Sequence, residues 1–478
     1  MICKYDDQIR AWIEAHKEEM IEDLFTLCRI PSVRGEAEEG APYGKACAEA
    51  VKCAAKMFEK QGFKVRVEAD RGYALARYEK GEKTIGLYGH ADVVPVGDGW
   101  IKTEPFNPVV IDGVFFGRGV GDNKAGVIES LYAMRMIKEL GLPLNTTVQA
   151  FVGSNEESGM GDVTAFAKYE KMPEINLAPD ASYPCSVGEK GILRAWTRSR
   201  EKLTDILDFD GGNASNIVLD YVTVRLAKKD GLMAELTSLI GDRKEFNLTE
   251  EGDVLLLEAN GVSKHAAHPE DSINAAYLAF ELLASATTLC ETDRSLMAKG
   301  AKAIGCFNGS GLGIAHEDPA FGKLTAVCGM VRVEEGALKI NMDIRYGNTF
   351  AGDDVERILG ENWDALGFDI TDMNNRPGFR LEDDNPVPPV LCAIYKELTG
   401  VESEPQLLSG GTYSRVLKNS FSVGFRAHDP DSTTEKPELP AGHGAAHQRD
   451  ECLIADNFFQ SLRVVTNYVL ACDEILSR

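Results

Sequence analysis

Thr84-Ile85-Gly86-Leu87-Tyr88-Gly89-His90-Ala91-Asp92 is the stretch from which the fold of this chain can be worked out. Its first five residues are mostly apolar or small and predict a short buried strand, a type common in parallel sheets. His90 and Asp92 follow, and on an extended chain two residues that are two apart point to the same side. Ligand sites in α/β sheets lie at the carboxyl ends of strands. We therefore expect a parallel sheet with chemically active side chains where this strand ends.

Strands and helices alternate around this stretch. Apolar residues at helical spacing predict helices over 43–61, 124–140 and 162–171, and strand-like runs lie at 63–68, 73–78, 147–153 and 175–178. This alternation predicts an α/β domain, with a mostly parallel sheet and helices on both faces.

The pattern changes after residue 187. Strand-like runs at 221–227, 253–260, 324–334 and 337–345 combine with helical stretches at 231–240 and 273–290, which predicts a second, α+β domain with antiparallel strands. From residue 382 helices and strands alternate again, and a last helix is predicted over 453–476. We expect a discontinuous first domain, residues 1–186 with 382–478, and an inserted domain over 187–381.

The composition excludes several classes of function. Lys and Arg number 51 against 75 Asp and Glu, and the net charge of −24 disfavours nucleic acid as a partner because phosphates repel an acidic surface. The sequence has no run of roughly 20 apolar residues for a membrane span and no apolar signal-peptide core near its start. Eleven cysteines without a CxxC pair are typical of a reducing compartment. We expect a cytoplasmic protein that does not enter a membrane.

Four further segments carry side chains that can bind metal ions. They are Gly117–Lys124 with Asp122, Ser154–Gly159 with Glu156 and Glu157, Ala178–Asp180, and Gly442–Gln448 with His443 and His447. Ordinary alternatives exist, since Asp122 could cap the following helix and Asp180 could be a turn residue. Together His90, Asp122, Glu157, Asp180 and His447 supply two imidazoles and three carboxylates. This set suits two divalent cations that share one carboxylate, with zinc, cobalt or manganese as the metal.

In series, these segments resemble the co-catalytic metallopeptidase family that includes carboxypeptidase G, the aminoacylases, succinyl-diaminopimelate desuccinylase and the PepV-type dipeptidases. The PepV-type branch is the most similar. The resemblance runs from His90 to Glu451 and rests on His90-Ala91-Asp92-Val93-Val94-Pro95-Val96-Gly97-Asp98-Gly99-Trp100, Gly117-Arg118-Gly119 through Lys124, Glu156-Glu157-Ser158-Gly159, Pro179-Asp180-Ala181-Ser182-Tyr183-Pro184 and Gly410-Gly411-Thr412-Tyr413. It implies that the inserted domain is a ferredoxin-like lid.

The resemblance also implies a role for each motif residue. His90 and Asp180 would hold one metal ion, Glu157 and His447 the other, and Asp122 would bridge them. Glu156 would be the general base, Asp92 would orient His90, and His265 of the lid would steady the oxyanion. Implied substrate contacts are Asn216, Arg345, Gly410, Gly411 and Thr412. His443 is an extra imidazole, so the last ligand is open between it and His447.

The implied activity is hydrolysis of dipeptides, or very short peptides with a free terminus, by water that two metal ions activate. An N-acyl-amino-acid deacylase or desuccinylase of the same family is the alternative, and a non-catalytic binding protein on this fold is another. A monomer and a homodimer are both compatible with the resemblance. The long 187–381 segment favours the arrangement of the PepV-type branch, in which an enlarged lid supplies His265 within one chain.

Overall fold

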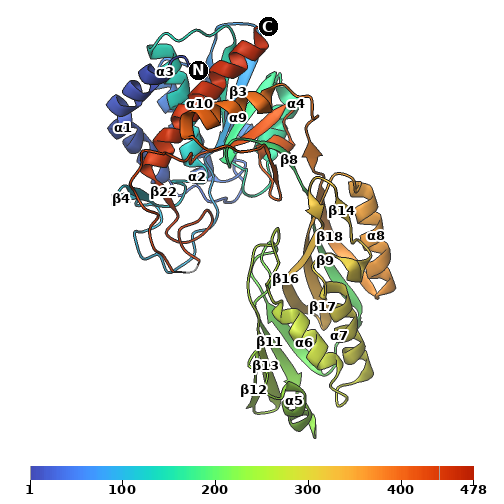
Figure 1. Cartoon of the computed structure of the whole chain (residues 1–478). Coiled ribbons are helices and arrows are strands. Elements are labelled where there is room, and N and C mark those ends of the chain that lie inside the picture. The colour runs from blue at the N-terminus through green and yellow to red at the C-terminus, as the bar shows by residue number, and fades with distance from the viewer. Residues whose placement is uncertain (1, 441) are drawn as a thin grey trace. The chain divides into compact units, whose positions relative to one another are not determined.

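The computed structural model describes residues 2–440 and 442–478, and the chain divides into two compact units (Figure 1). The first unit consists of Met1–Gly188, Leu381–Gln406 and Thr412–Arg478, and the second of Glu189–Arg380 and Leu407–Gly411. The long insertion therefore starts and stops within two residues of the predicted boundaries. The short segment Leu407–Gly411, predicted for the first domain, is grouped with the second unit.

The first unit is built on a six-stranded sheet in the order β1-β2-β6-β3-β7-β21. The strands are β1 (Lys64–Glu68), β2 (Tyr73–Tyr78), β3 (Thr84–His90), β6 (Thr147–Gly153), β7 (Ile175–Ala181) and β21 (Ser420–Gly424). β3 runs parallel to β6 and β7, and β7 runs parallel to β21, whereas β2 is antiparallel to both of its neighbours. The predicted mostly parallel sheet is confirmed.

The two faces of this sheet supply two separate cores. Ile85 and Leu87 belong to one core, and Tyr88 of the same strand belongs to the other, as the alternation of side chains along a strand requires. The first core also contains side chains from α1 (Asp6–Cys28), α2 (Lys45–Lys60), α3 (Lys124–Glu139), α9 (Val387–Thr399) and α10 (Ala455–Leu476). The second core contains α4 (Gly161–Tyr169). Helices therefore cover both faces.

Gly89 explains how α3 comes to lie close to the end of β3. A Cβ atom at this position would be 2.9 Å from the backbone nitrogen of Val127, so any larger residue would push the helix away. The close packing brings the segment before α3, which contains Asp122, next to His90 at the end of the strand.

The second unit contains an eight-stranded sheet in the order β12-β13-β11-β10-β16-β17-β9-β18, in which neighbouring strands are antiparallel. Its strands are β9 (Gly191–Lys202), β10 (Ile206–Gly211), β11 (Tyr221–Ala227), β12 (Phe246–Glu251), β13 (Val254–Asn260), β16 (Thr325–Glu334), β17 (Ala337–Tyr346) and β18 (Phe368–Arg376). Its helices are α5 (Leu232–Ile240), α6 (Ala275–Ala284), α7 (Glu291–Ile304) and α8 (Gly352–Ala365). One core joins buried residues of the sheet to all four helices, as the α+β prediction requires.

The single helix predicted over 273–290 is wrong in its second half. α6 begins after Asn274, whose side chain accepts hydrogen bonds from the backbone of Ala276 and Tyr277, and it ends at Ala284. Glu235 then accepts hydrogen bonds from the backbone nitrogens of Thr287 (2.7 Å) and Thr288 (2.9 Å). These bonds fix a turn before α7, which apolar spacing alone does not reveal.

Shorter elements complete the chain. Three small sheets are formed by β4 (Val109–Ile111), β5 (Val114–Phe116) and β22 (Cys452–Ile454), by β8 (Ser186–Glu189), β19 (Phe379–Arg380) and β20 (Gln406–Leu408), and by β14 (Glu317–Asp318) and β15 (Gly322–Lys323). The 3-10 helices are η1 (Ala69–Arg71), η2 (Ser310–Leu312) and η3 (Tyr413–Arg415). Within the described residues, every helix is too short or too polar to cross a bilayer.

Candidate active site

The five predicted metal ligands come from separate elements and meet in the first unit. His90 ends β3, Asp180 lies near the end of β7, and Glu157 is in the loop after β6. Asp122 lies just before α3, and His447 lies in the segment that leads to β22. The parallel strands β3, β6 and β7 thus present their carboxyl ends to one region, as expected for a site in an α/β sheet.

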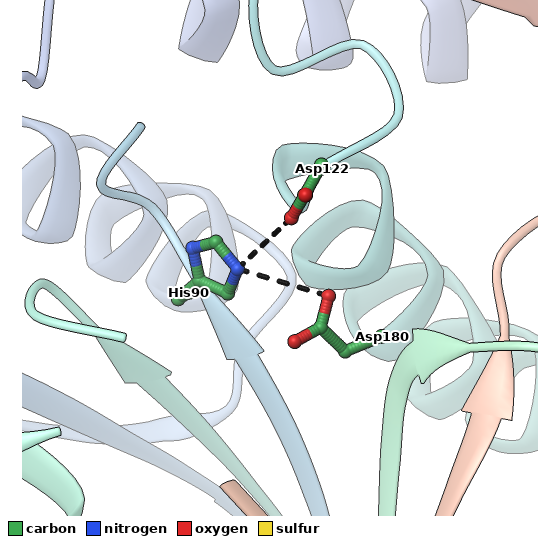
Figure 2. A group of neighbouring side chains, drawn as sticks. All are labelled: His90, Asp122 and Asp180. Atoms are coloured by element: carbon green, nitrogen blue, oxygen red, sulfur yellow. Dashed lines mark ion pairs between the residues drawn. The ribbon is translucent and has the colours of Figure 1, made fainter. Parts of the chain in front are cut away.

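The first group of ligands surrounds His90. Its Nε2 atom lies 3.2 Å from Oδ1 of Asp122 and 3.7 Å from Oδ1 of Asp180. Figure 2 shows both carboxylates directed at this nitrogen, Asp122 from the loop before α3 and Asp180 from β7. The ligand atoms of the three residues lie within 4.8 Å of one another, close enough to hold one metal ion.

The second group surrounds His447. Its Nε2 atom lies 3.0 Å from Oδ2 of Asp122 and 3.1 Å from Oε2 of Glu157. Asp122 therefore belongs to both groups and turns one carboxylate oxygen to each. This is the geometry that a carboxylate bridging two cations requires.

His443 lies apart from both groups. Its Nδ1 atom contacts the buried carboxylate of Asp450, which also accepts hydrogen bonds from the backbone of Ile101 and Lys102. Of the two imidazoles that the sequence leaves open, the structure therefore brings His447 to the candidate ligands.

Asp92 contacts His90 and also the loop that carries Glu156 and Glu157. The Nδ1 atom of His90 lies 3.0 Å from the carbonyl oxygen of Asp92 and 3.5 Å from its carboxylate. The carboxylate itself accepts hydrogen bonds from the backbone nitrogens of Glu156 and Glu157, both at 3.2 Å. The carboxylate of Asp92 therefore mainly holds the loop that carries the two glutamates. The backbone carbonyl of Asp92 lies nearer to the His90 imidazole than its carboxylate does.

The carboxylates of the site repel one another in a buried environment. Burial and the charge of Asp180 raise the pKa of Glu156 well above its usual value. Burial and the charge of Asp122 raise the pKa of Glu157 to about 7. Burial alone would lower the pKa of His447, but its hydrogen bonds to Asp122 and Glu157 raise it to about 11. In each shift the neighbouring carboxylates raise the pKa, as expected where negative charge is concentrated.

Several buried polar atoms of the site make no hydrogen bond of normal geometry with the described residues. They are Nε2 of His90, Oε1 of Glu156 and Oε1 of Glu157. Buried polar atoms are normally paired, and unpaired ones need an explanation. Divalent cations would satisfy the ligand atoms and offset the repulsion between the carboxylates, so the residues present fit a metal centre.

The remaining predicted residues belong to the second unit, except Thr412, which directly follows it in sequence. The backbone nitrogen of Ala266 donates to the carbonyl oxygen of Asn216 (2.8 Å), which places His265 and Asn216 on adjacent segments. Gly410 and Gly411 lie in the short segment grouped with the second unit. Thr412 begins the next segment of the first unit, where its side chain accepts from the backbone of Ser414 at the start of η3.

Arg345 is buried and already has partners. Its guanidinium donates to both carboxylate oxygens of Asp343, and its Nη1 atom donates to the carbonyl oxygen of Ser409 at 3.1 Å. Only 3% of Arg345 is exposed. Most donors of the predicted substrate fork are therefore used within the protein.

One further residue of the site, Asp162 in the first turn of α4, is only weakly indicated by the sequence. Its buried carboxylate accepts hydrogen bonds from the backbone of Ser154 (2.7 Å) and Asn155 (2.8 Å) and from the hydroxyl of Tyr413 (2.6 Å). These bonds fix the start of the loop that carries Glu156. The only available signal is an acidic residue in the first turn of the helix that follows the two glutamates.

A mostly parallel sheet that presents carboxylate and imidazole groups around one shared aspartate is an arrangement that suits a metal-dependent hydrolase. The chain belongs to peptidase family M20/M25/M40, whose sequence profile matches residues 86–470. It is thus a hydrolase that acts on peptide bonds, and its family depends on metal ions.

Relatives match over nearly their whole length. A protein of Bacillus subtilis (strain 168) that carries the provisional name dipeptidase YtjP is 29% identical over 458 residues, which cover 93% of this chain and 95% of the relative. Human carnosine dipeptidase 1 is 14% identical with a TM-score of 0.61, and 98% of this chain and 99% of that chain are covered. The di-peptidase Dug1p from Saccharomyces cerevisiae is 15% identical with a TM-score of 0.60 and 99% coverage of both chains. These two likenesses show the fold.

Proposed function

We propose that this peptidase is a dipeptidase that uses two divalent cations to hydrolyse dipeptides or very short peptides with a free terminus. The carrying observation is Asp122, whose two carboxylate oxygens face two different groups of ligands. The names of the relatives support a dipeptide substrate.

Each cation would have its own pair of ligands. His90 and Asp180 would hold one, Glu157 and His447 the other, and Asp122 would bridge them. Zinc suits this mixture of imidazole and carboxylate, and manganese or cobalt is the alternative. When bound, the cations would polarise the scissile carbonyl group and lower the pKa of water.

Glu156 is the general base in this proposal. Its backbone is anchored to Asp92, and its buried Oε1 atom makes no hydrogen bond of normal geometry to the described residues. In this role Glu156 would take a proton from the attacking water and pass it to the leaving amine.

Residues of the second unit, together with Thr412 of the first, would supply the substrate contacts. His265 would donate to the oxyanion, and Asn216 on the adjacent segment would contact the substrate beside it. Arg345 would bind a free carboxylate through its remaining N–H groups, with Asp343 holding the guanidinium in place. The loop Gly410-Gly411-Thr412 would line the substrate pocket.

Metal analysis and a substrate panel test the proposal together. Mass spectrometry should find two divalent cations per chain, and free dipeptides should be cleaved much faster than N-acyl or N-succinyl amino acids. Preference for acylated amino acids would instead identify a deacylase or desuccinylase. Cation binding without hydrolysis of either substrate class would identify a binding protein on this fold.

The variant Glu156→Gln tests the base directly. Turnover of a dipeptide should fall by roughly 10²–10⁴, the usual contribution of general acid–base catalysis, while two cations stay bound. The exposed Glu82 provides a control, since Glu82→Gln should change neither quantity. Activity like that of the wild type in Glu156→Gln would remove this residue from the mechanism.

A further inference from the structure

Glu451 is a buried carboxylate in contact with the loop that leads to Asp122. Its Oε1 atom accepts hydrogen bonds from the backbone nitrogens of Gly119 (3.2 Å), Gly121 (3.0 Å) and Asp122 (3.0 Å). Only 1% of the residue is exposed. One carboxylate oxygen therefore binds three amides, including that of the candidate bridging residue itself.

The local fold explains why Glu451 reaches this loop. β22 pairs with β5, with Cys452 opposite Phe116, so the residue before β22 lies beside the residue after β5. The backbone nitrogen of Gly117 donates to the carbonyl oxygen of Glu451 at 3.0 Å. A Cβ atom on Gly121 would be 3.2 Å from the ring of Phe425 and 3.4 Å from Oε1 of Glu451, so a glycine suits the crowded approach.

Arg118 extends the contact to the segment that carries His447. Its Nη1 atom lies 2.7 Å from Oε2 of Glu451, and both side chains are almost fully buried. Its Nη2 atom donates to the carbonyl oxygen of His447 at 3.4 Å. Glu451 and Arg118 thus connect the loop that carries Asp122 to the segment that carries the imidazole facing it.

We propose that Glu451 is a positioning residue for the metal centre, a role that rests on the proposed function. It holds the backbone of Asp122 so that Oδ1 faces His90 while Oδ2 faces His447. A bridging carboxylate must serve two cations at once, and functional geometry of this kind has to be held to within about 0.5 Å. Glu451 touches neither cation nor substrate and acts through Asp122.

The test measures metal affinity rather than activity. Metal-free wild-type protein and Glu451→Gln are titrated with Zn²⁺ in competition with a chromophoric chelator. Glutamine keeps the shape of the side chain but replaces the charged acceptor, and supporting residues of this kind typically change metal affinity 10–100-fold. We expect a loss of this size for both cations, because both share Asp122.

Asp473→Asn is the matched control for a merely structural effect. Asp473 is also buried and accepts hydrogen bonds from the backbone of Asn145 (2.8 Å) and Thr146 (2.7 Å), in a loop without candidate ligands. Asp473→Asn should lower the melting temperature but leave Zn²⁺ affinity unchanged. If Glu451→Gln does not fold, Glu451→Asp decides, since it keeps the charge but is too short to reach all three amides.

Each outcome decides a different claim. Zn²⁺ affinity in the Glu451 variant equal to that of the wild type, or an equal loss in Asp473→Asn, overturns the positioning role alone. A wild-type protein that binds no pair of cations overturns the proposed function, and the positioning role with it.

Discussion

Replacement of Glu129 by glutamine should stabilise the folded protein at neutral pH. Glu129 lies in α3 and is fully buried. The hydroxyl of Ser461 is close enough to lower its pKa a little, but neither carboxylate oxygen makes a hydrogen bond of normal geometry with the described residues. Burial therefore raises the pKa of Glu129 well above its usual value.

The sign and size of the effect follow from this shift. In the unfolded chain the pKa of a glutamate is about 4.3, so as the pH rises the unfolded chain loses its proton before the folded one does. The stability that the protonated carboxyl contributes is complete below about pH 4. As the pH rises from the unfolded pKa to the folded pKa, this stability is lost by up to about 1.4 kcal/mol per pH unit. Glutamine does not titrate, so its contribution does not change with pH. The free energy of unfolding of the variant should therefore rise relative to that of the wild type, at this rate, from about pH 5 upward.

Urea unfolding at several pH values between 5 and 8 checks the prediction. The two compact units can unfold separately, so the comparison uses the transition of the first unit, which contains α3. Glu59→Gln, at an exposed position of α2, should leave the pH dependence of the free energy of unfolding unchanged. A difference between Glu129→Gln and the wild type that does not vary with pH, or a less stable variant at pH 7, would refute the reasoning.

Two further predictions concern histidines. His447→Ala should lose one bound cation and most of its turnover, whereas His443→Ala should keep its metal content because His443 contacts Asp450 and neither ligand group; equal metal content in the two variants, measured by mass spectrometry, would contradict this. His265→Ala should lower turnover of a dipeptide about 10²–10³-fold with unchanged metal content, as loss of an oxyanion donor usually does, and unchanged steady-state kinetics would reject the role.

Elements with a strong apolar period could be predicted closely. The helix predicted over 124–140 is found at Lys124–Glu139, and β6 has the predicted bounds. α1 was not predicted because many charged residues lie between its buried ones, such as Ile9, Trp12 and Met20, and no side chain caps its start. α7 was missed because the predicted helix before it ran on through the turn that Glu235 fixes.

Some residues of the candidate site could likewise be predicted from sequence patterns, and others could not. His90, Glu157 and Asp180 could be predicted because they follow short apolar strands, and Asp122 because it follows closely spaced glycines. Asp162 and Glu451 bind backbone amides of distant loops, and no residue pattern specifies which amides a carboxylate will find. The partners of Arg345 were also missed, although Asp343 is two residues away on the same face of β17.

The first unit is synthesised in separate segments, before and after the second unit. The second unit is almost continuous in sequence and is complete before β21, His447 and α10 have been synthesised. Domains tend to condense as they emerge, so the insertion can fold while the edge of β7 still awaits its partner strand and Asp122 has only one of its two imidazoles. A nascent chain halted after the second unit but before β21 would leave that strand edge exposed and prone to aggregation. A peptidase assembled in this order acquires its full set of candidate metal ligands only when its translation is nearly finished.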